Sequence, residues 1–556
     1  MTTSRFGISR LWMSAAMVTA AAVGITAVAA GAGATGVHPA AAVSITPTST
    51  ANGYKFLDQM MDKYATGSTT RLVQSFIADS AMGSFTDSVT YDDALVVDAL
   101  LARGTADDLA RAQVIGNALL YVQANDAAKD GRIRAAYAPK PLTSPSKVDA
   151  TDDTSDVGNM AWVGQALVQL YAKTGVKSYL TGATSVATWI QKNAYATSGP
   201  GGYTGGYDSS GKLTWKSTEH NIDLFAFFSM LATETGDSAW STDAGHAQSF
   251  VTAMWDSAGK KFWVGTNPDG TSLNKGFLPE DVNTWSYLAL KDPAYSASID
   301  WDVANLAVTD GTFTGVSFAA CDRSKVWFEG TAHLADALAV RDGAGDAAKA
   351  QGYLNSIQLA QTTAVHNDGL GIVAASHDKL SDCDSDYYYA APHTGATSWY
   401  LLAGTAADPF LLLPGGSTGG GTATTYEAES TANALSGTAS VIACGACSGG
   451  ERVGHLGKQS SGTGTLTFNG VTATGGAGAY QVVVAFTDGS ASRQAALSVD
   501  GGTPQTVTFG TTGSFTTPGN QTVTLQLAAG TNTISVSDPD AAAPDIDAIT
   551  VPAAHS

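Results

Sequence analysis

The chain has 556 residues, of which 44% are apolar, so it can build one large hydrophobic core or two separate ones. Its formal net charge of −20 argues against nucleic acid, an anionic membrane surface or a strongly polyanionic substrate as a partner, because like charges repel. A neutral ligand is therefore favoured.

The start of the chain is typical of a secretory signal peptide. A charged stretch, RFGISR, comes before a long stretch rich in Ala and Val, and small residues at HPAAAVS offer a cleavage site. A membrane anchor is the alternative interpretation, but the segment is poor in Leu, which disfavours retention in a bilayer. We expect residues 1–42 to be a signal peptide and the mature protein to be secreted and extracellular, with no membrane partner.

Residues 43–413 are expected to be helical, with two kinds of helix alternating along the chain. Between segments that are apolar nearly all round lie segments with one apolar face. An inner and an outer ring of helices would show this contrast. The pattern resembles the all-α (α/α)6 toroid of the six-hairpin glycosidases and related lyases, and an irregular helical array is the alternative. The apolar segments begin at Tyr91, Asn159, Asn221, Asn283, Phe328 and Ala396.

The toroid resemblance implies that substrate binds where the N-terminal ends of the inner helices converge. Polar and aromatic residues recur at these ends in the sequence. Aromatic rings can cover the apolar face of a pyranose, and polar groups can pair with its hydroxyls. The expected substrate-binding residues are Asn159, His220, Asn221, Asn283, Trp285, Trp327, His333, Tyr389 and His393.

Carboxylates at the same helix ends are the candidate catalytic residues: Asp92, Asp93, Glu219, Asp223 and Glu329. Glu219 and Asp223 are four residues apart and share one helix face, so their repulsion can keep one of them protonated near neutral pH. A glycosidase needs its second carboxylate on the other side of the scissile bond, and therefore from another helix. Glu329 is the first choice for this partner, followed by Asp92 or Asp93. Acidic residues also stabilise the first turn of any helix, which is the structural alternative for each of them.

The four cysteines indicate two disulfides. Cys321 and Cys383 are far apart, whereas Cys444 and Cys447 form a CGAC pair in a Gly- and Ser-rich stretch. A zinc site would need a second closely spaced pair, which the sequence lacks. We expect the pairs 321–383 and 444–447, in agreement with export.

Residues 414–424 are rich in Gly, Ser and Thr and predict a flexible linker to a β-rich domain at 425–556. Short alternating segments separated by turn residues predict an antiparallel β-sandwich of the jelly-roll kind. The motifs YEAES, CSGGERVGHLG, LAAGTNTISVS and PDIDAITV resemble family 35 and family 6 carbohydrate-binding modules. The resemblance implies a structural calcium ion held by Glu427, Glu429 and Asp547, and such oxygen ligands suit calcium.

Sugar contacts in this module are harder to predict, because no tryptophan follows Trp399. A stacking platform would have to use Tyr480, Phe486 or His455. Arg493 and Asp545 are weaker candidates on loops.

The two resemblances together imply a secreted glycoside hydrolase that acts on a neutral polysaccharide or oligosaccharide by a two-carboxylate mechanism. The module would hold the enzyme near its polymer. We expect a monomer that uses no cofactor for catalysis. A polysaccharide lyase is the first alternative, with His220, Asn221, Tyr203 and His393 acting on a uronate, although the expected cleft is acidic rather than basic. A non-catalytic glycan-binding protein is the second.

Overall fold

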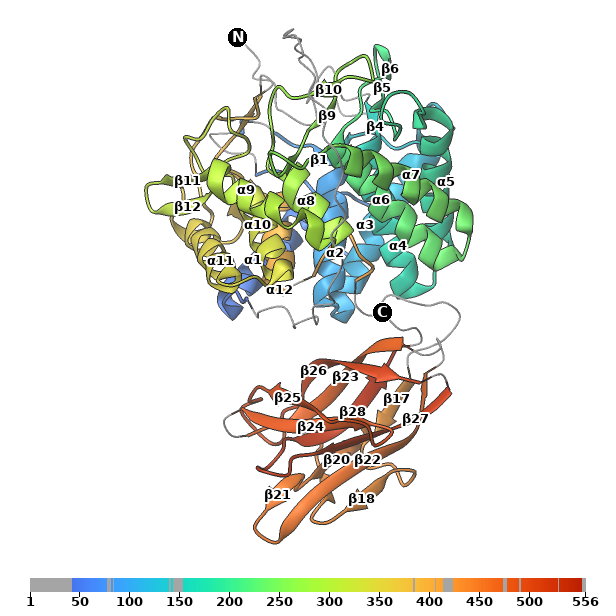
Figure 1. Cartoon of the computed structure of the whole chain (residues 1–556), viewed down its shortest axis with the longest axis vertical. Helices are drawn as coiled ribbons and strands as arrows, with labels where there is room; N and C mark the ends of the chain where they lie inside the picture. Colours follow the sequence, from blue (N-terminus) through green and yellow to red (C-terminus); the bar gives the residue numbers. More distant parts are fainter. Residues whose placement is uncertain are drawn as a thin grey trace. The chain divides into compact units, whose positions relative to one another are not determined.

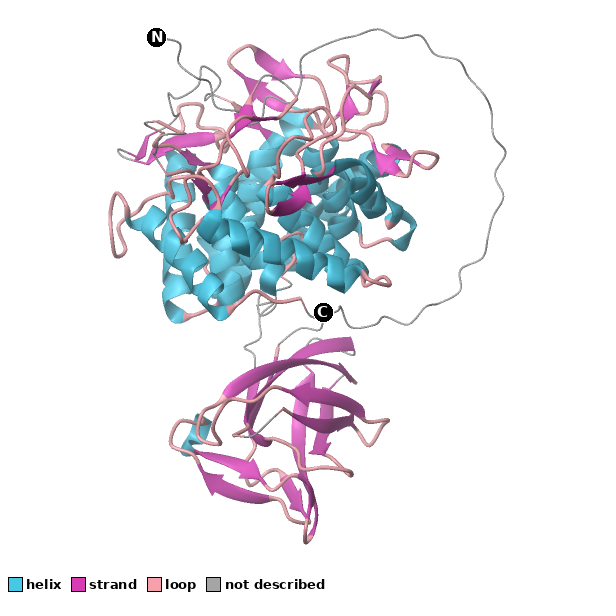
Figure 2. Ribbon diagram, turned by 90° about the vertical axis from the view of Figure 1, so that its left-hand side faces the viewer, coloured by secondary structure: helices cyan, strands magenta, loops and turns pink. Residues whose placement is uncertain are grey.

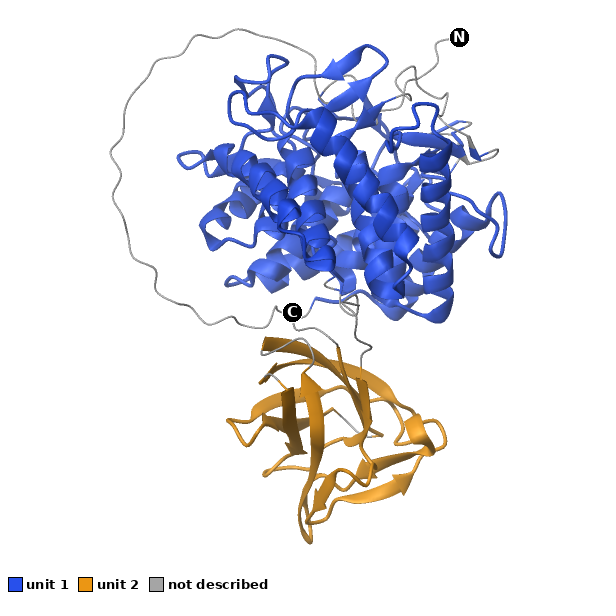
Figure 3. Cartoon of the chain, turned by 90° about the vertical axis from the view of Figure 1, so that its right-hand side faces the viewer, with its two compact units in different colours: residues 1–413 blue, residues 414–556 orange. Residues whose placement is uncertain are grey.

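The computed structural model describes residues 43–77, 82–83, 85–139, 142–143, 154–383, 386–405, 407–413, 424–473, 478–489, 492–528 and 530–552. The predicted signal peptide and nearly all of the predicted linker lie outside these residues. The chain divides into two compact units, residues 1–413 and 414–556 (Figure 3). In the described part of the chain, no helix is both long enough and apolar enough to cross a membrane.

The N-terminal unit is helical, as predicted, and its described residues contain twelve α-helices (Figure 1). The even-numbered helices are α2 (Thr90–Arg103), α4 (Val157–Thr174), α6 (Thr218–Thr235), α8 (Asp281–Leu290), α10 (Phe328–Arg341) and α12 (Thr394–Thr405). The odd-numbered helices are α1 (Pro47–Asp62), α3 (Ala106–Asn125), α5 (Lys177–Ala194), α7 (Ser238–Ala253), α9 (Ala297–Leu306) and α11 (Asp346–Thr363).

Local signals explain where these helices begin and end. The Asp156 and Ser217 side chains accept hydrogen bonds from the first turns of α4 and α6, which is the usual role of an N-cap residue. The helices α2, α4 and α6 each end at a glycine in the left-handed conformation, for example Gly175, where a side chain would be strained. Because of the Ser217 cap, α6 begins three residues before the apolar run at Asn221.

The helices contact one another in a regular order. Each even-numbered helix contacts the next one, and α12 contacts α2, so the six contacts close a cycle. Each even-numbered helix also packs against an odd-numbered neighbour: α2 on α3, α4 on α5, α6 on α7, α8 on α9, α10 on α11, and α12 on α1. The even-numbered helices are accordingly buried on nearly all sides, and Trp162 of α4 and Phe227 of α6 are among the largest fully buried side chains.

Short strands gather mainly at one end of the helices (Figure 2). Three of them run directly into even-numbered helices: β1 into α2, β4 into α4 and β16 into α12. The N-terminal ends of these helices therefore lie among the strands. The strands are β1 (Ser88–Val89), β2 (Ala136–Pro139), β3 (Leu142–Thr143), β4 (Ser155–Asp156), β5 (Gly206–Asp208), β6 (Gly211–Leu213), β7 (Trp255–Asp256), β8 (Lys261–Phe262), β9 (Gly265–Thr266), β10 (Leu273–Asn274), β11 (Ala307–Asp310), β12 (Phe313–Val316), β13 (Ile372–Val373), β14 (Leu380–Ser381), β15 (Tyr387–Tyr388) and β16 (Pro392–His393).

The C-terminal unit consists of two six-stranded antiparallel sheets around one apolar core, which confirms its predicted β-rich character. One sheet has the order β19-β20-β28-β23-β26, with β17 also paired to β28, and the other has the order β18-β22-β27-β24-β25, with β21 paired to β22. The strands are β17 (Thr424–Glu427), β18 (Ala434–Ser436), β19 (Ser440–Ala443), β20 (Glu451–Gly454), β21 (Gly457–Gln459), β22 (Gly462–Ala473), β23 (Gly478–Thr487), β24 (Arg493–Val499), β25 (Gln505–Phe509), β26 (Gly519–Leu527), β27 (Gly530–Ser537) and β28 (Asp545–Val551).

Two of the predicted stacking residues are part of this core. Tyr480 and Phe486 belong to the set of alternate, buried residues of β23 that point between the sheets, where their exposed fractions are 0% and 4%. They cannot stack on a sugar, so this prediction is wrong for both. His455 is exposed.

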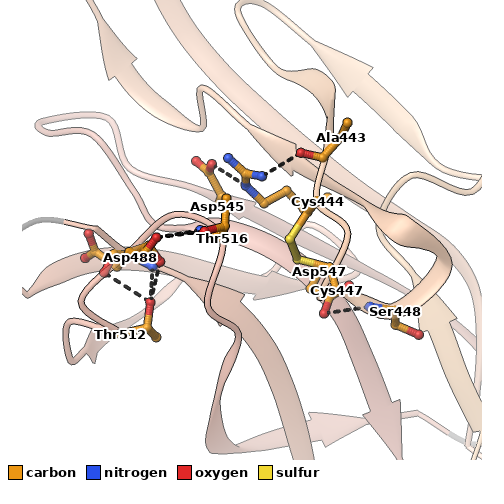
Figure 4. The surroundings of a disulfide bond; sticks show 11 residues. Ala443, Cys444, Cys447, Ser448, Asp488, Thr512, Thr516, Asp545 and Asp547 are labelled. Carbon is orange, nitrogen blue, oxygen red and sulfur yellow. Dashed lines mark hydrogen bonds and ion pairs between the residues drawn. A yellow bond between two sulfur atoms is a disulfide. The ribbon is translucent and has the colours of Figure 1, made fainter.

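Both predicted disulfides are present. Cys321 pairs with Cys383 in the N-terminal unit, and Cys444 pairs with Cys447 in the C-terminal unit. The second one closes a short loop between β19 and β20 (Figure 4).

Candidate active site

A pocket lies at the N-terminal ends of the even-numbered helices. Six carboxylic acids line it, together with two histidines and a set of aromatic rings, and no Lys or Arg is among its described lining residues. The lining residues are Phe76, Val89, Tyr91, Asp92, Asp156, Gly158, Asn159, Trp162, Glu219, His220, Asp223, Asp281, Trp285, Phe318, Trp327, Glu329, Tyr388 and His393.

Glu329 is held on both sides of its carboxyl group. The Tyr91 hydroxyl donates a hydrogen bond of 2.7 Å to its Oε1, and the Trp399 indole N–H donates in turn to the Tyr91 oxygen at 2.8 Å. The Nδ1 atom of His393 lies 3.4 Å from Glu329 Oε2. These contacts restrict the carboxyl group to one orientation.

His393 lies between two carboxylates. Its Nε2 is 3.1 Å from Asp92 Oδ2, and its Nδ1 is within reach of both Glu329 and the backbone N–H of Ala396, the latter at 3.2 Å. Burial by itself lowers the pKa of an imidazole, but here Asp92 and Glu329 outweigh burial and raise the pKa of His393 to about 10. In its protonated form this residue neutralises part of the charge of both acids.

The environment of Glu219 is the opposite of that of Glu329. Within the described residues its carboxyl group makes no hydrogen bond, and burial together with the charges of Asp281, Asp156 and Glu329 raises its pKa well above the usual value. Such a shift favours the protonated form of Glu219. This acid lies in the same pocket as Glu329, which has His393 as a partner.

Asp223 lies one helical turn below Glu219. Both of its oxygens are buried and have no hydrogen-bond partner among the described residues, and burial, followed by the charge of Glu219, raises its pKa well above the usual value. A protonated acid is compatible with this burial, whereas an unpaired charge is not. The predicted repulsion between Glu219 and Asp223 is thus one contribution to the shift, and burial is the larger one.

Asp281, at the start of α8, is a third acid with a perturbed pKa. Burial raises the pKa of Asp281 to about 7, although the N–H of Val282 opposes the shift by donating to the carboxyl group. Asp156, by contrast, caps α4 and accepts hydrogen bonds from both the backbone and the side-chain amide of Asn159 at 2.8 Å. The amide oxygen of Asn159 then accepts from the N–H of Tyr91, which links the beginnings of α4 and α2.

Aromatic residues form the floor of the pocket. Trp162 and Trp285 line it, with ring centroids 5.4 Å apart, and Trp399 packs against both from below. Phe410 contacts all three rings. Phe410, close to the last residue of the N-terminal unit, therefore packs against the rings that form this floor.

The structure brings most of the predicted catalytic residues together. Asp92, Glu219, Asp223 and Glu329 all line the pocket, although they come from three helices. Asp93 does not. Its two oxygens accept hydrogen bonds from the N–H of Val73 and the hydroxyl of Ser88, and its side chain is fully buried outside the pocket.

The predicted substrate-binding residues divide into two groups. Those in the pocket are Asn159, His220, Trp285, Trp327 and His393. Those outside it are Asn221, Asn283, His333 and Tyr389, each of them buried. The pKa of the pocket residue His220 is lowered by burial, so this side chain is neutral.

The four residues outside the pocket have structural contacts instead. Asn221 bonds to the backbone of Tyr203 and Ser217, and Asn283 bonds to Asp302 and to the N–H of Phe262. His333 accepts or donates a hydrogen bond of 3.1 Å at Glu280 and packs against Trp399. Tyr389 packs in a small apolar cluster with Met82, Phe85 and Ala391. The geometry gives no support to substrate contact by any of the four.

Several lining residues were not predicted, namely Tyr91, Asp156, Trp162, Asp281, Phe318 and Tyr388. Asp156 and Asp281 belong to the same polar clusters that indicated their neighbours, so the type and place of the residue were visible in the sequence. Tyr388 was visible in the run Tyr387, Tyr388 and Tyr389. Phe318 had no signal, because it lies in a loop between β12 and α10.

A second group of acids lies in the C-terminal unit, beside the loop closed by Cys444 and Cys447. The Ser448 hydroxyl donates to Glu427 at 2.7 Å. The N–H of Ser448 donates to Asp547 at 3.2 Å (Figure 4). Glu427, Glu429 and Asp547 each have one buried oxygen without a hydrogen-bond partner in the described structure. Burial, followed by the charge of Glu427 and Asp547, raises the pKa of Glu429.

These three acids fit a cation chemically, because orphaned carboxylate oxygens are the ligands that calcium prefers. The three acids are not arranged as a complete metal site, because the described residues contain no group of three or more His, Cys, Asp or Glu side chains placed to hold a metal ion. The calcium ligands thus stay a prediction.

Comparisons with known proteins concern the C-terminal unit. Residues 465–551 match a family model described as CBM13-like, the CBM13 domain of alpha-galactosidase. Among solved structures, a family 35 carbohydrate-binding module from Clostridium thermocellum is 34% identical, with 98% of that chain and 23% of this one covered and a TM-score of 0.22. A family 35 module from Paenibacillus barcinonensis is 26% identical, with 97% of that chain and 23% of this one covered and a TM-score of 0.21.

A longer structure was also found, the exo-beta-1,3-galactanase from Phanerochaete chrysosporium. It is 30% identical, with 29% of that chain and 24% of this one covered and a TM-score of 0.22. No curated protein matches the chain. The predicted carbohydrate-binding character of the C-terminal unit is confirmed by the family model, which has the CBM13-like description rather than family 35 or family 6. The chain therefore carries a domain of the carbohydrate-binding-module type at its C-terminal end.

Proposed function

We propose that the protein is a secreted glycoside hydrolase that cleaves a neutral polysaccharide or oligosaccharide, and that its N-terminal unit is an (α/α)6 toroid. The closed cycle of contacts among the six even-numbered helices, each backed by an odd-numbered helix, supports the toroid. The module-like C-terminal unit supports a carbohydrate polymer as the substrate. The two disulfides are compatible with secretion.

The observation that carries the proposal is the contrast between Glu219 and Glu329. They share one pocket, but the first has a pKa raised well above its usual value and the second is paired with Tyr91 and His393. Two carboxyl groups in such different environments are what acid and base chemistry on a glycosidic bond requires.

In the proposed mechanism, Glu219 donates its proton to the glycosidic oxygen as the bond to the leaving sugar breaks. The Glu329 carboxylate stabilises the positive charge that develops on the ring, and acts either as nucleophile or as base toward water. Tyr91 and His393 hold the Glu329 carboxylate in one orientation throughout. The separation of the two carboxyl groups around a bound sugar decides between retention and inversion.

The pocket disfavours a uronate substrate. A uronate carries a negative charge, and the described lining offers six acids and neither Lys nor Arg to receive it. Neutral sugars avoid this repulsion, and the aromatic floor of Trp162 and Trp285 suits the apolar face of a pyranose.

The test is an assay of the mature protein on neutral mannans, glucans, galactans and xylans and on a polygalacturonate. Reducing ends and the absorbance of unsaturated sugars are followed together. We expect reducing ends without absorbance, and a loss of about 10²- to 10⁴-fold in Glu219→Gln and Glu329→Gln. Asp93→Asn is the matched control, because Asp93 lies outside the pocket. The amide oxygen can still accept from the N–H of Val73, and the amide NH₂ can donate to the Ser88 hydroxyl in place of the present bond.

Each other outcome of this assay has a definite meaning. New absorbance on polygalacturonate identifies a lyase. Silence on every polysaccharide, together with measurable binding, identifies a non-catalytic glycan-binding protein. Full activity of Glu219→Gln removes Glu219 from the mechanism.

We also propose that calcium binds in the C-terminal unit through Glu427, Glu429 and Asp547. Each of the three has an orphaned buried oxygen, and Ser448 already orders two of them. When bound, the ion supplies positive charge that offsets the repulsion among these acids and so stabilises the unit.

A further inference from the structure

Three aromatic rings form one side of the pocket, and we call Phe318, Trp327 and Tyr388 the aromatic wall. The ring centroids are 5.0 Å apart for Phe318 and Trp327, and 5.5 Å apart for each of these rings and Tyr388. All three residues line the pocket. They come from separate parts of the chain: the loop after β12, the residue before α10, and β15.

A disulfide joins two of these parts. Cys321 follows Phe318 by three residues, and Cys383 precedes Tyr388 by five. The same loops are joined by a hydrogen bond of 3.0 Å from the N–H of Ser381 to Asp322 Oδ2. Cys383 itself packs against the apolar cluster that contains the wall. The disulfide therefore limits how far Tyr388 can move from Phe318.

Tyr388 is the member of the wall that offers surface to a ligand. Phe318 and Trp327 are 2% and 3% exposed and act as its backing, whereas Tyr388 is partly exposed. Its hydroxyl is close enough to the pocket acids to sense their charge: burial first, and then Glu329, raises its pKa well above 10. The phenol thus keeps its proton at any working pH and remains a hydrogen-bond donor.

We propose that Tyr388 is a substrate-contacting residue, and that the Cys321–Cys383 disulfide positions it. The ring covers the apolar face of one sugar unit, and the hydroxyl donates a hydrogen bond to an oxygen of that sugar. The inference rests on the proposed function, because it places a sugar in the pocket between the wall and the acids. It assigns the disulfide a role in substrate affinity in addition to stability.

The loop that carries Phe318 is also bonded to the backbone at the start of α8. The N–H of Glu280 donates to the carbonyl of Phe318 at 2.9 Å, immediately before Asp281 at the start of α8. Opening the disulfide therefore loosens one side of the pocket, whereas Glu219 and Glu329 stay in place because they belong to the helices α6 and α10. The expected kinetic result is a change in KM rather than in kcat.

The experiment compares Tyr388→Ala, Tyr388→Phe and the double variant Cys321→Ser/Cys383→Ser with the wild type. The substrate is whichever of the assayed polysaccharides releases most reducing ends. We expect KM to rise about 10-fold or more in Tyr388→Ala, several-fold in Tyr388→Phe because one hydrogen bond is lost, and about 10-fold in the double variant. In each case kcat should change by less than about threefold.

The matched control is Cys444→Ser/Cys447→Ser, which removes the other disulfide and leaves the N-terminal unit intact. Its KM should equal that of the wild type on a soluble oligosaccharide of the same sugar. Near-UV circular dichroism of each variant shows whether the fold is retained. If the cysteine variant does not fold, the two Tyr388 variants decide the inference alone.

A second readout does not depend on hydrolysis. Tryptophan fluorescence is titrated with the same polysaccharides, and it reports only on the N-terminal unit because no tryptophan follows Trp399. An unchanged KM and an unchanged fluorescence midpoint in Tyr388→Ala overturn the inference while the proposed function stands. A wild type that neither hydrolyses nor changes its fluorescence on any polysaccharide overturns both.

Discussion

Replacing His393 by Gln is expected to destabilise the N-terminal unit most below pH 6.5 and progressively less as the pH rises above it. His393 is 6% exposed and lies between Asp92 and Glu329. Burial opposes protonation, but the two carboxylates outweigh it and raise the pKa of His393 from 6.5 to about 10. Gln keeps a hydrogen-bond donor at this position and removes the positive charge.

The magnitude follows from the linkage between proton binding and folding. Each unit by which the folded pKa exceeds the unfolded one is worth about 1.4 kcal/mol, so the shift of His393 contributes up to about 5 kcal/mol to the free energy of unfolding. Because the folded pKa is the higher of the two, the contribution is complete below pH 6.5 and is lost as the pH rises toward 10. About half of it should remain near pH 8.

The assay is urea unfolding of the wild type and His393→Gln at several pH values between about 6.5 and 9.5, followed by tryptophan fluorescence. This signal comes from the N-terminal unit alone, since Trp399 is the last tryptophan. Other buried acids with raised pKa values, such as Asp223, also cost stability as the pH rises, but they do so in both proteins and cancel in the difference.

A difference in unfolding free energy that stays constant over this range would refute the reasoning. It would mean that folded His393 is neutral, with Nε2 donating to Asp92 and Nδ1 accepting from the N–H of Ala396. The positive charge beside Glu329 would then be absent, and the proposed base would have to rely on Tyr91 alone.

Three further predictions concern the acids. Glu219→Gln should lower kcat by about 10²- to 10⁴-fold without loss of stability, because a neutral amide replaces an acid whose raised pKa favours its neutral form. A urea midpoint so low that most of the variant is unfolded under the assay conditions would contradict this. Asp93→Ala should lower the free energy of unfolding by about 1–3 kcal/mol, because a buried N–H and a hydroxyl lose their acceptor, and kcat of the folded fraction should stay the same. Calcium at about 100 times its Kd should stabilise the C-terminal unit by about 2.7 kcal/mol in calorimetry of the full chain, and EDTA should reverse the effect. Glu429→Gln should abolish the calcium response, whereas substitution of the exposed Glu451 should preserve it.

The helical character of the first unit and the β-rich character of the second could be predicted because burial leaves a local pattern in the sequence. Helices that are apolar all round differ from helices with one apolar face, and strands with alternating residues differ from both. The glycine C-caps after α2, α4 and α6 and the two disulfides also follow from residue type and spacing. The helix ends at which acids and aromatic residues gather could also be predicted, because these residues lie next to the starts of the apolar segments in the sequence.

The individual site residues were only partly predictable, because adjacent residues point in different directions. On a helix each residue is turned about 100° from the one before it, so Asp92 faces the pocket while Asp93 bonds to Val73 and Ser88. His220 and Asn221 differ in the same way. In β15 and just after it, alternation along an extended chain separates Tyr388, which lines the pocket, from Tyr389, which does not.

By itself, the sequence determined that this protein has a helical unit and a β-rich carbohydrate-binding unit, and that acids collect at one end of the helices. Only the tertiary structure decided that the pKa of Glu219 is raised by its surroundings while Glu329 is held by Tyr91 and His393. The reason is physical: periodicity depends on the nearest residues along the chain, whereas the pKa and orientation of a carboxyl group depend here on neighbours more than sixty residues away in the sequence.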